Sequence, residues 1–229
     1  MRMKKIIVAI DGPASSGKST TAKQLAKKLD CIYVDSGAMY RAVALYLLKN
    51  KIDFHDKTML KKALVAINIE IISSKHKEEN TIILNGENVT KKIREPEITN
   101  YSSTIAKDGL IRERMVELQR KLAETRSIVM DGRDIGTVVF PHADFKFFVI
   151  ASIEERAKRR WLENQNKGLG SKTLHEIKQE LAFRDKTDST REIAPLKKAE
   201  DAIEIDTTNL SIQQQVEEIY GIIKNEIFL

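Results

Sequence analysis

The chain has 229 residues, of which 41% are hydrophobic and 31% charged, and its formal net charge is +6. This length predicts one α/β domain with insertions or two small domains, able to fold without a disulfide or a metal. The single cysteine, Cys31, excludes an intrachain disulfide, and the scattered histidines lack the neighbouring cysteines of a structural zinc site.

The positive charge favours anionic partners such as phosphorylated metabolites or nucleic acid, although a lysine-rich solvated surface gives the same balance. Aromatic residues make up only 6% of the chain. Surfaces that bind nucleic acid interleave aromatic rings with positive charge, so we expect no nucleic-acid partner. The apolar run 6–10 behind the basic N-terminus is too short for a signal peptide or a membrane span. We expect a cytoplasmic monomer without a membrane partner.

The first predicted element is a buried strand at 5–10, which runs into the segment GPASSGKST at 12–20. This segment matches G-x-x-x-x-G-K-[ST], whose backbone N–H groups surround a β-phosphate at the start of a helix, here predicted over 20–29. Lys18 would reach the β- and γ-phosphate oxygens from an exposed position, and the Ser19 hydroxyl would hold Mg²⁺. A surface glycine turn is the alternative. The residues predicted to bind the triphosphate are Gly12, Pro13, Ala14, Ser15, Ser16, Gly17, Lys18, Ser19 and Thr20.

A second predicted strand at 32–34 ends at Asp35, and a helical run follows it. Behind this run, the segment NKID at 50–53 fits the N-K-x-D pattern with which GTPases read guanine. It lies too close to the phosphate-binding loop for that role, and no D-x-x-G switch segment separates the two. We interpret it as a solvated loop.

Two stretches interrupt the alternation of strands and helices. Between about 61 and 100, strand-like runs at 67–72 and 81–84 flank a polar segment, and Asn85-Gly86 is typical of a hairpin turn. This pattern predicts a small β-rich insertion. The second stretch, about 164–196, is polar and contains Gly168 and Gly170, which indicates a mobile cover. The core of a single domain would then comprise 1–60 and 101–229.

A helix over 111–122 leads to a third strand at 128–130, which ends in Asp131. Beside a phosphate-binding loop, this carboxylate would support Mg²⁺ through water, although any parallel strand can end in aspartate. Strands at 145–150 and 202–205 follow, and capping boxes at Ser152 and Ser211 predict a helix behind each. Strands separated by helices predict a parallel sheet with ligands bound beyond the carboxyl ends of its strands.

Arginines gather where an enzyme that handles phosphate needs them: Arg41, Arg112, Arg133, Arg156, Arg159, Arg160, Arg184 and Arg191. Phosphoryl transfer spreads negative charge over the γ-oxygens, and guanidinium groups neutralise this charge while fixing geometry. We predict that Arg156 and Arg160 bind the triphosphate, with a basic solvated helix face as the alternative. For Arg184 and Arg191 the alternative is surface pairing.

Several segments resemble the bacterial cytidylate kinase family: GPASSGKST at 12–20, DSGAMYR at 35–41 and DGRDIGTVVFP at 131–141. LNGENVT at 84–90 and residues 93–94, 119–120, 184–191 and 194–196 agree in order and spacing, so the resemblance covers essentially the whole chain. It implies a P-loop NTPase-type three-layer α/β fold with a five-stranded parallel sheet, a small NMP-binding insertion and a short lid. It also implies transfer of the ATP γ-phosphoryl group, with Mg²⁺, to CMP or dCMP.

Carried over by position, the resemblance implies a role for each predicted residue. The acceptor phosphate would be held by Ser36, Arg41 and Arg133, the cytosine read by Ser103, Arg112 and Asp134, and the sugar and phosphates reached from the lid by Arg184, Asp188 and Arg191. Tyr40 belongs to the same substrate-binding set. The charge of the transferred group would be neutralised by Lys18, Arg133, Arg184 and Arg191.

Two rival functions stay open at this point. The nearer is a P-loop kinase for another small molecule, such as a different nucleotide or a sugar acid. The further is a GTPase-type switch with no metabolite acceptor.

Overall fold

A five-stranded sheet with the strand order β2-β6-β1-β7-β8 forms the centre of the structure, and all four of its strand pairs are parallel. The computed structural model describes residues 5–72, 80–166, 168 and 170–227. The elements in chain order are β1 (Ile7–Asp11), α1 (Lys18–Lys28), β2 (Ile32–Asp35), α2 (Ser36–Lys49), α3 (Lys57–Ala66), β3 (Ile69–Ile72), β4 (Thr81–Leu84), β5 (Glu87–Asn88), the 3₁₀-helix η1 (Lys92–Arg94), α4 (Pro96–Ile105), α5 (Gly109–Leu122), β6 (Ile128–Gly132), the π-helix η2 (Ile135–Val139), β7 (Phe145–Ile150), α6 (Ile153–Asn166), α7 (Leu174–Thr190), β8 (Ile203–Asp206) and α8 (Ile212–Ile227).

The predicted parallel sheet is confirmed, with small changes at the strand ends. Asp11, Asp35 and Asp131 are the final or penultimate residues of β1, β2 and β6, whereas the sequence placed them just beyond the strands. The backbone of each aspartate is therefore held by the sheet. Its side chain starts from a fixed position at the carboxyl edge.

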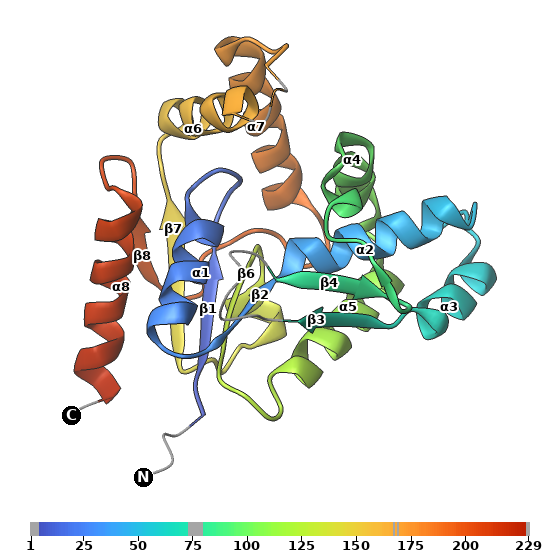
Figure 1. Cartoon of the computed structure of the whole chain (residues 1–229), viewed down its shortest axis with the longest axis horizontal. Helices are drawn as coiled ribbons and strands as arrows, with labels where there is room; N and C mark the ends of the chain where they lie inside the picture. Colours follow the sequence, from blue (N-terminus) through green and yellow to red (C-terminus); the bar gives the residue numbers. More distant parts are fainter. Residues whose placement is uncertain (1–4, 73–79, 167, 169, 228–229) are drawn as a thin grey trace.

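Helices cover both faces of this sheet, which gives the expected three layers (Figure 1). Successive side chains of a strand point to opposite faces. In β1, Val8 and Ile10 pack with residues of α1 and α8, whereas Ala9 packs with residues of α2 and α5. Two apolar cores thus lie on the two sides of one sheet, and the alternation along β1 determines which residue enters which core.

The predicted insertion forms its own three-stranded antiparallel sheet, ordered β3-β4-β5. Asn85 and Gly86 have φ angles of 48° and 83°, as a two-residue type I′ hairpin turn requires, so the predicted turn is confirmed. The predicted limits near 61 and 100 cut through α3 and α4, because these helices flank the small sheet. Most of the polar run between the first two strands, 73–79, lies outside the described residues.

Much of the stretch predicted as a mobile cover is helical. Its main element, α7, begins with a capping box between Thr173 and Glu176 that the sequence analysis missed. A small apolar cluster joins α6 and α7 to the phosphate-binding loop, and its buried members are Ala14, Ala157, Ile177 and Leu181. Only a narrow face of α7 is apolar, which explains why its composition resembles that of a loop.

The two predicted capping boxes differ in the structure. At Ser211 both bonds form: the hydroxyl accepts from the Gln214 N–H at 3.3 Å, and the Gln214 side chain accepts from the Ser211 N–H at 2.8 Å. At Ser152 the hydroxyl accepts from the Glu155 N–H at 3.2 Å, but the Glu155 carboxylate pairs with Arg159 at 2.9 Å. No helix within the described ranges is long and apolar enough to span a membrane.

Replacing Leu181 with alanine is expected to destabilise the protein by about 2–4 kcal/mol, because it opens a cavity in the cluster that holds α7 against the phosphate-binding loop. Urea unfolding measures this loss. The matched control is Leu174→Ala on the same helix, since Leu174 is 48% exposed, and a change within about 0.5 kcal/mol is expected there. Equal losses in the two variants would contradict the packing assigned to Leu181.

Candidate active site

A cleft of about 860 Å³ opens at the carboxyl ends of the central strands. It collects residues from the phosphate-binding loop, the ends of β2 and β6, the insertion, α5 and α7. The predicted site residues that line it are Ala14, Ser15, Gly17, Lys18, Ser19, Thr20, Ser36, Tyr40, Arg41, Ser103, Arg112, Asp131, Arg133, Asp134, Arg160, Arg184, Asp188 and Arg191. Four predicted residues are outside its lining: Gly12, Pro13, Ser16 and Arg156.

The phosphate-binding loop needs glycine at both of its ends. Gly12 has φ 152°, and a Cβ atom there would lie 2.1 Å from the carbonyl oxygen of Val149 in β7. Gly17 has φ 92°, and a Cβ atom there would lie 2.8 Å from the side-chain oxygen of Gln215 in α8. Gly12 thus lets the loop leave β1 against the neighbouring strand, and Gly17 lets it enter α1 beneath α8.

Lys18 is buried, so the expectation of an exposed lysine was wrong. Its ammonium group donates to the Pro13 carbonyl oxygen at 3.1 Å, because the side chain folds back across its own loop inside the cleft. Burial, reinforced by the charge of Arg133 and opposed by Asp131, lowers the pKa of Lys18 to about 7. An anionic ligand beside it would favour the charged form.

Ser19 and Asp131 meet as predicted. The Ser19 hydroxyl donates to one Asp131 carboxylate oxygen at 2.6 Å, and the Tyr33 hydroxyl donates to the other at 2.8 Å. Burial, with Asp131 nearby, raises the pKa of Tyr33 well above its ordinary value, so this hydroxyl remains a donor. Hydroxyl and carboxylate oxygens suit Mg²⁺, which takes one or two protein ligands beside substrate phosphates. The residues present therefore fit the expected metal.

Two arginines that line the cleft are already paired with carboxylates. Arg41 donates to Asp35 at 2.9 Å, and Arg133 donates to Asp188 at 2.8 Å. Burial raises the pKa of Asp35, but Arg41 and the Ala38 N–H outweigh it, and the pKa falls below its ordinary value. Asp35 thus joins the N-terminus of α2 to Arg41. The sequence analysis missed Asp35 as a site residue, although it is the first residue of the DSGAMYR segment.

A third cluster lies between α2, α5 and the end of α7. Asp134 pairs with Arg112, and Arg191 lies with a guanidinium nitrogen 3.8 Å from the other carboxylate oxygen. Burial raises the pKa of Asp134 above its ordinary value, although the positive charges of these two arginines lower it. The side chain of Asp134 does not cap the following π-helix η2, which removes one structural explanation for it. Tyr40 lies beside the cluster, its ring centroid 5.8 Å from the Arg112 guanidinium carbon.

Ser103 and Ser36 meet backbone oxygens in this structure. The Ser103 hydroxyl donates to the Thr99 carbonyl at 3.4 Å, and the Ser36 hydroxyl donates to the Asp131 carbonyl at 2.7 Å. The second bond ties the start of α2 to the end of β6. Both serines line the cleft, so each hydroxyl can still accept a bond from a ligand.

Arg184 enters the cleft from α7 with part of its guanidinium group unsatisfied. Its buried Nε has no hydrogen-bond partner among the described residues, and the same holds for Nη2 of Arg191. Burial, followed by the repulsion of Arg133, lowers the pKa of Arg184 to about 10. Partly unsatisfied guanidinium groups that converge on one cleft favour an anionic ligand.

Arg156 is not among the residues that line the cleft, so the structure does not bring it to the predicted triphosphate site. Its guanidinium group donates to the carbonyl oxygens of Ala14 and Ala151 and pairs with Asp185 at 2.7 Å, so it lies buried between the loop and α7. Its neighbour Arg160 does line the cleft and donates to the Ser15 hydroxyl at 3.2 Å. One turn of helix separates a residue buried inside the protein from one that lines the cleft.

Other lining residues were not among the predicted site residues, although Asp35, Thr90 and Arg159 lie in segments or sets that the sequence analysis named. They come mainly from the insertion and from the segments beside the phosphate-binding loop, and include Lys23, Tyr33, Asp35, Asn80, Thr90, Arg94, Thr99, Ser102, Arg159, Leu210, Ser211 and Gln215. The NKID segment at 50–53 supplies none of the lining and follows the end of α2, as a solvated loop would.

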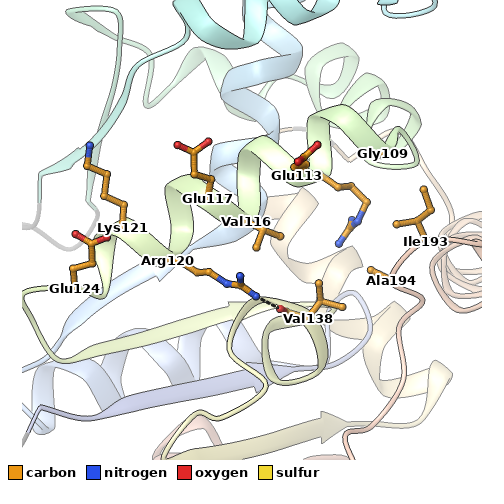
Figure 2. A pocket seen from close by; sticks show the side chains of 11 residues that line it. Gly109, Glu113, Val116, Glu117, Arg120, Lys121, Glu124, Val138, Ile193 and Ala194 are labelled. Atoms are coloured by element: carbon orange, nitrogen blue, oxygen red, sulfur yellow. Dashed lines mark hydrogen bonds between the residues drawn. The ribbon is translucent and has the colours of Figure 1, made fainter.

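A second cavity, of about 760 Å³, lies between α5 and the facing residues Val138, Ile193 and Ala194 (Figure 2). It shares Arg112 with the main cleft, and Arg120 crosses it to donate to the carbonyl oxygens of Val138 and Val139. Its charged lining alternates in sign, with Arg120 and Lys121 beside Glu113 and Glu117. This lining matches no triphosphate, so the main cleft is the candidate site.

Comparison with known proteins supports this assignment. The cytidylate kinase family model matches residues 8–225. Cytidylate kinases of Bacillus thuringiensis (strain Al Hakam) and Bacillus anthracis (strain A0248) are 51% identical to this chain over 222 residues, which is 96% of this chain and of each relative. A crystal structure of an uncharacterized protein from Eubacterium ventriosum ATCC 27560 covers 98% of this chain and 99% of its own, with TM-score 0.49 and 16% identity, and supports no inference.

The resemblance seen in the sequence is therefore confirmed over nearly the whole length of the chain. A phosphate-binding loop, an Mg²⁺-compatible pair and converging arginines in one cleft agree with it. This chain belongs to the cytidylate kinase family.

Proposed function

We propose that this chain transfers the γ-phosphoryl group of ATP to CMP or dCMP and so produces ADP and CDP or dCDP. Family membership supports the reaction, and one observation supports its proposed location: a single cleft joins the phosphate-binding loop to the Arg112–Asp134–Arg191 cluster. An assay of ADP release over CMP, dCMP, UMP, AMP and GMP tests the proposal. Release that depends on CMP or dCMP is expected, and release without an acceptor would indicate an NTPase.

The donor end would hold ATP by its phosphates. The loop backbone, Lys18 and Arg160 would contact the triphosphate, and Arg156 would support the loop from below. Ser19 and, through water, Asp131 would hold Mg²⁺, which when bound neutralises charge on the phosphate oxygens. The hydrogen bond between these two residues supports this placement.

At the acceptor end, an oxygen of the CMP phosphate attacks the γ-phosphorus, and the bond between this phosphorus and the β,γ-bridging oxygen breaks as ADP leaves. The attacking oxygen is already ionised, so no general base is needed. Arg41, Arg133 and Ser36 would hold the acceptor phosphate, and Arg184 would neutralise charge between the two nucleotides. The protein contributes position and charge, which phosphoryl transfer chiefly requires.

The base would be read by the buried cluster at the far end of the cleft. Cytosine offers an N4 amino donor where uracil offers an acceptor, and the Asp134 carboxylate accepts from the first. Cytosine N3 accepts from a guanidinium such as that of Arg112, whereas uracil N3 carries a proton. Tyr40 and Ser103 would border the same base.

The insertion near 61–100 would form the NMP-binding side of the cleft, and the segment near 164–196 the lid. Asn80 and Thr90 line the cleft from the insertion, and Arg184 and Asp188 line it from α7. A lid over both nucleotides would exclude water and so protect ATP from hydrolysis. A cytoplasmic monomer without nucleic-acid or membrane partners suits an enzyme that takes free nucleotides from solution.

Lys18→Ala is expected to lower kcat by about a hundredfold or more, because it removes a charge that faces the transferred group. The circular dichroism spectrum should not change. Lys27→Ala, in the same helix but exposed, serves as the control and should retain normal turnover. Near-normal activity of a folded Lys18→Ala protein would overturn the assignment of the phosphate-binding loop.

Arg191→Ala is expected to reduce kcat/KM for CMP by about tenfold or more while the affinity for ATP stays within about twofold, since a lid arginine engages after closure. Steady-state kinetics and ATP titration measure the two effects. Lys186→Ala, exposed on α7, is the control. Equal losses in ATP affinity and kcat/KM would place Arg191 in a static ATP site.

Asp134→Ala is expected to shrink the ratio of kcat/KM for CMP over UMP by about tenfold or more, because one base-edge pair contributes ~1–3 kcal/mol. The two substrates control for each other within one protein. A parallel loss on both would assign Asp134 a structural role and leave base selection to Ser103 and Arg112.

A further inference from the structure

The carboxylate of Asp11 lies against the segment that follows Asp134. One oxygen accepts from the Ile135 N–H at 2.8 Å, and the other accepts from the Gly136 N–H at 2.7 Å. Asp11 ends β1 and is 5% exposed, so water does not compete for these bonds. The two carboxylate oxygens of Asp11 thus accept hydrogen bonds from two consecutive backbone N–H groups, those of residues 135 and 136.

These contacts cap the π-helix η2 from outside its own segment. The first N–H groups of a helix need acceptors, and the residue just before the helix usually supplies one. Asp134 holds that position but makes no capping bond with its side chain. Because Asp11 satisfies the donors instead, the Asp134 carboxylate can turn toward Arg112 and Arg191.

The segment has little room to move around this contact. A Cβ atom on Gly136 would lie 3.2 Å from Cδ of Lys146 and 3.5 Å from an Asp11 carboxylate oxygen. In the sheet, Asp11 pairs with Gly132 of β6 and with Phe148 of β7. Burial raises the pKa of Asp11 to about 7, although the two hydrogen bonds from backbone N–H groups lower it. A carboxyl that is costly to bury beside a cleft is a candidate for a functional role.

We infer that Asp11 is a positioning residue for base selection, which holds the backbone at 135–136 so that the Asp134 carboxylate faces the acceptor base. The inference rests on the base-reading role proposed for Asp134. Asp11 also directly precedes Gly12, so the strand that leads into the phosphate-binding loop also holds the backbone at 135–136, next to Asp134. Asp11 itself is not among the residues that line the cleft.

The test is Asp11→Asn, which keeps the shape of the side chain but sets an amide NH₂ against one backbone N–H. We expect the CMP/UMP ratio of kcat/KM to fall by about fivefold, because a bond to a charged acceptor is lost. The KM for ATP should stay within about twofold, and the KM for CMP should rise. A purely structural role would not separate the two substrates in this way.

Asp144→Asn is the matched control. Asp144 accepts from the Ile7 N–H at 2.8 Å, at the other end of the same strand, so it also joins a carboxylate to backbone but lies away from the cleft. This variant should keep the wild-type CMP/UMP ratio. In an Asp134→Ala background, Asp11→Asn should leave the ratio unchanged, since the effect acts through Asp134.

Several outcomes would overturn the inference. Equal losses on CMP and UMP, an equal rise in the KM for ATP, or an additive effect in the Asp134→Ala background would each show that Asp11 does not act through Asp134. If Asp11→Asn does not fold, Asp11→Glu retains the charge and shifts the acceptors, and it should lower the ratio as well. Failure of both variants to fold would make Asp11 a fold determinant only.

The same measurements distinguish a failure of the base-reading role of Asp134 from a failure of the positioning role of Asp11. If Asp134→Ala leaves the CMP/UMP ratio unchanged, Asp134 does not read the base, whatever Asp11→Asn does. If Asp134→Ala lowers the ratio and Asp11→Asn does not, the base reading stands and the positioning role of Asp11 is overturned.

Discussion

Three neighbouring parallel strands, β2, β6 and β1, each carry an aspartate at their carboxyl end, and the rest of the site depends on how these carboxyls are satisfied. A carboxylate withdrawn from water needs hydrogen bonds or a counter-charge. Asp11 takes two backbone N–H groups, Asp35 takes a guanidinium and an N–H, and Asp131 takes two hydroxyls. The hydrogen bonds of each aspartate hold a different segment of the chain at the same edge of the sheet.

The arginines at this edge of the sheet are paired with carboxylates. Arg41, Arg133 and Arg112 each pair with an aspartate, so like charges share a small volume without repelling one another at full strength. In the proposed site, an acceptor phosphate would therefore join existing ion pairs at Arg41 and Arg133. Pairs of this kind contribute orientation and selectivity more than affinity. This fits a reaction in which position matters more than tight binding.

The sequence predicts the parts of this molecule that depend on local pattern. The parallel strands, the Asn85-Gly86 turn and the Ser211 capping box follow from residue types over short windows, and all are confirmed. The burial of Lys18 and the inward position of Arg156 depend on what packs above them, which no local pattern contains. The same is true of Tyr33 and Asp11, whose partners lie in segments far along the chain.

Helix α7 shows how one polar helix can respond to both halves of the cleft. Asp185 and Asp188 are three residues apart and so share one face of the helix. The first pairs with Arg156, which donates to Ala14 in the phosphate-binding loop, and the second pairs with Arg133 at the proposed acceptor end. Through these two aspartates, α7 is joined to both ends of the cleft. This double connection supports the proposed role of the segment near 164–196 as a lid over both nucleotides, which would keep water from ATP.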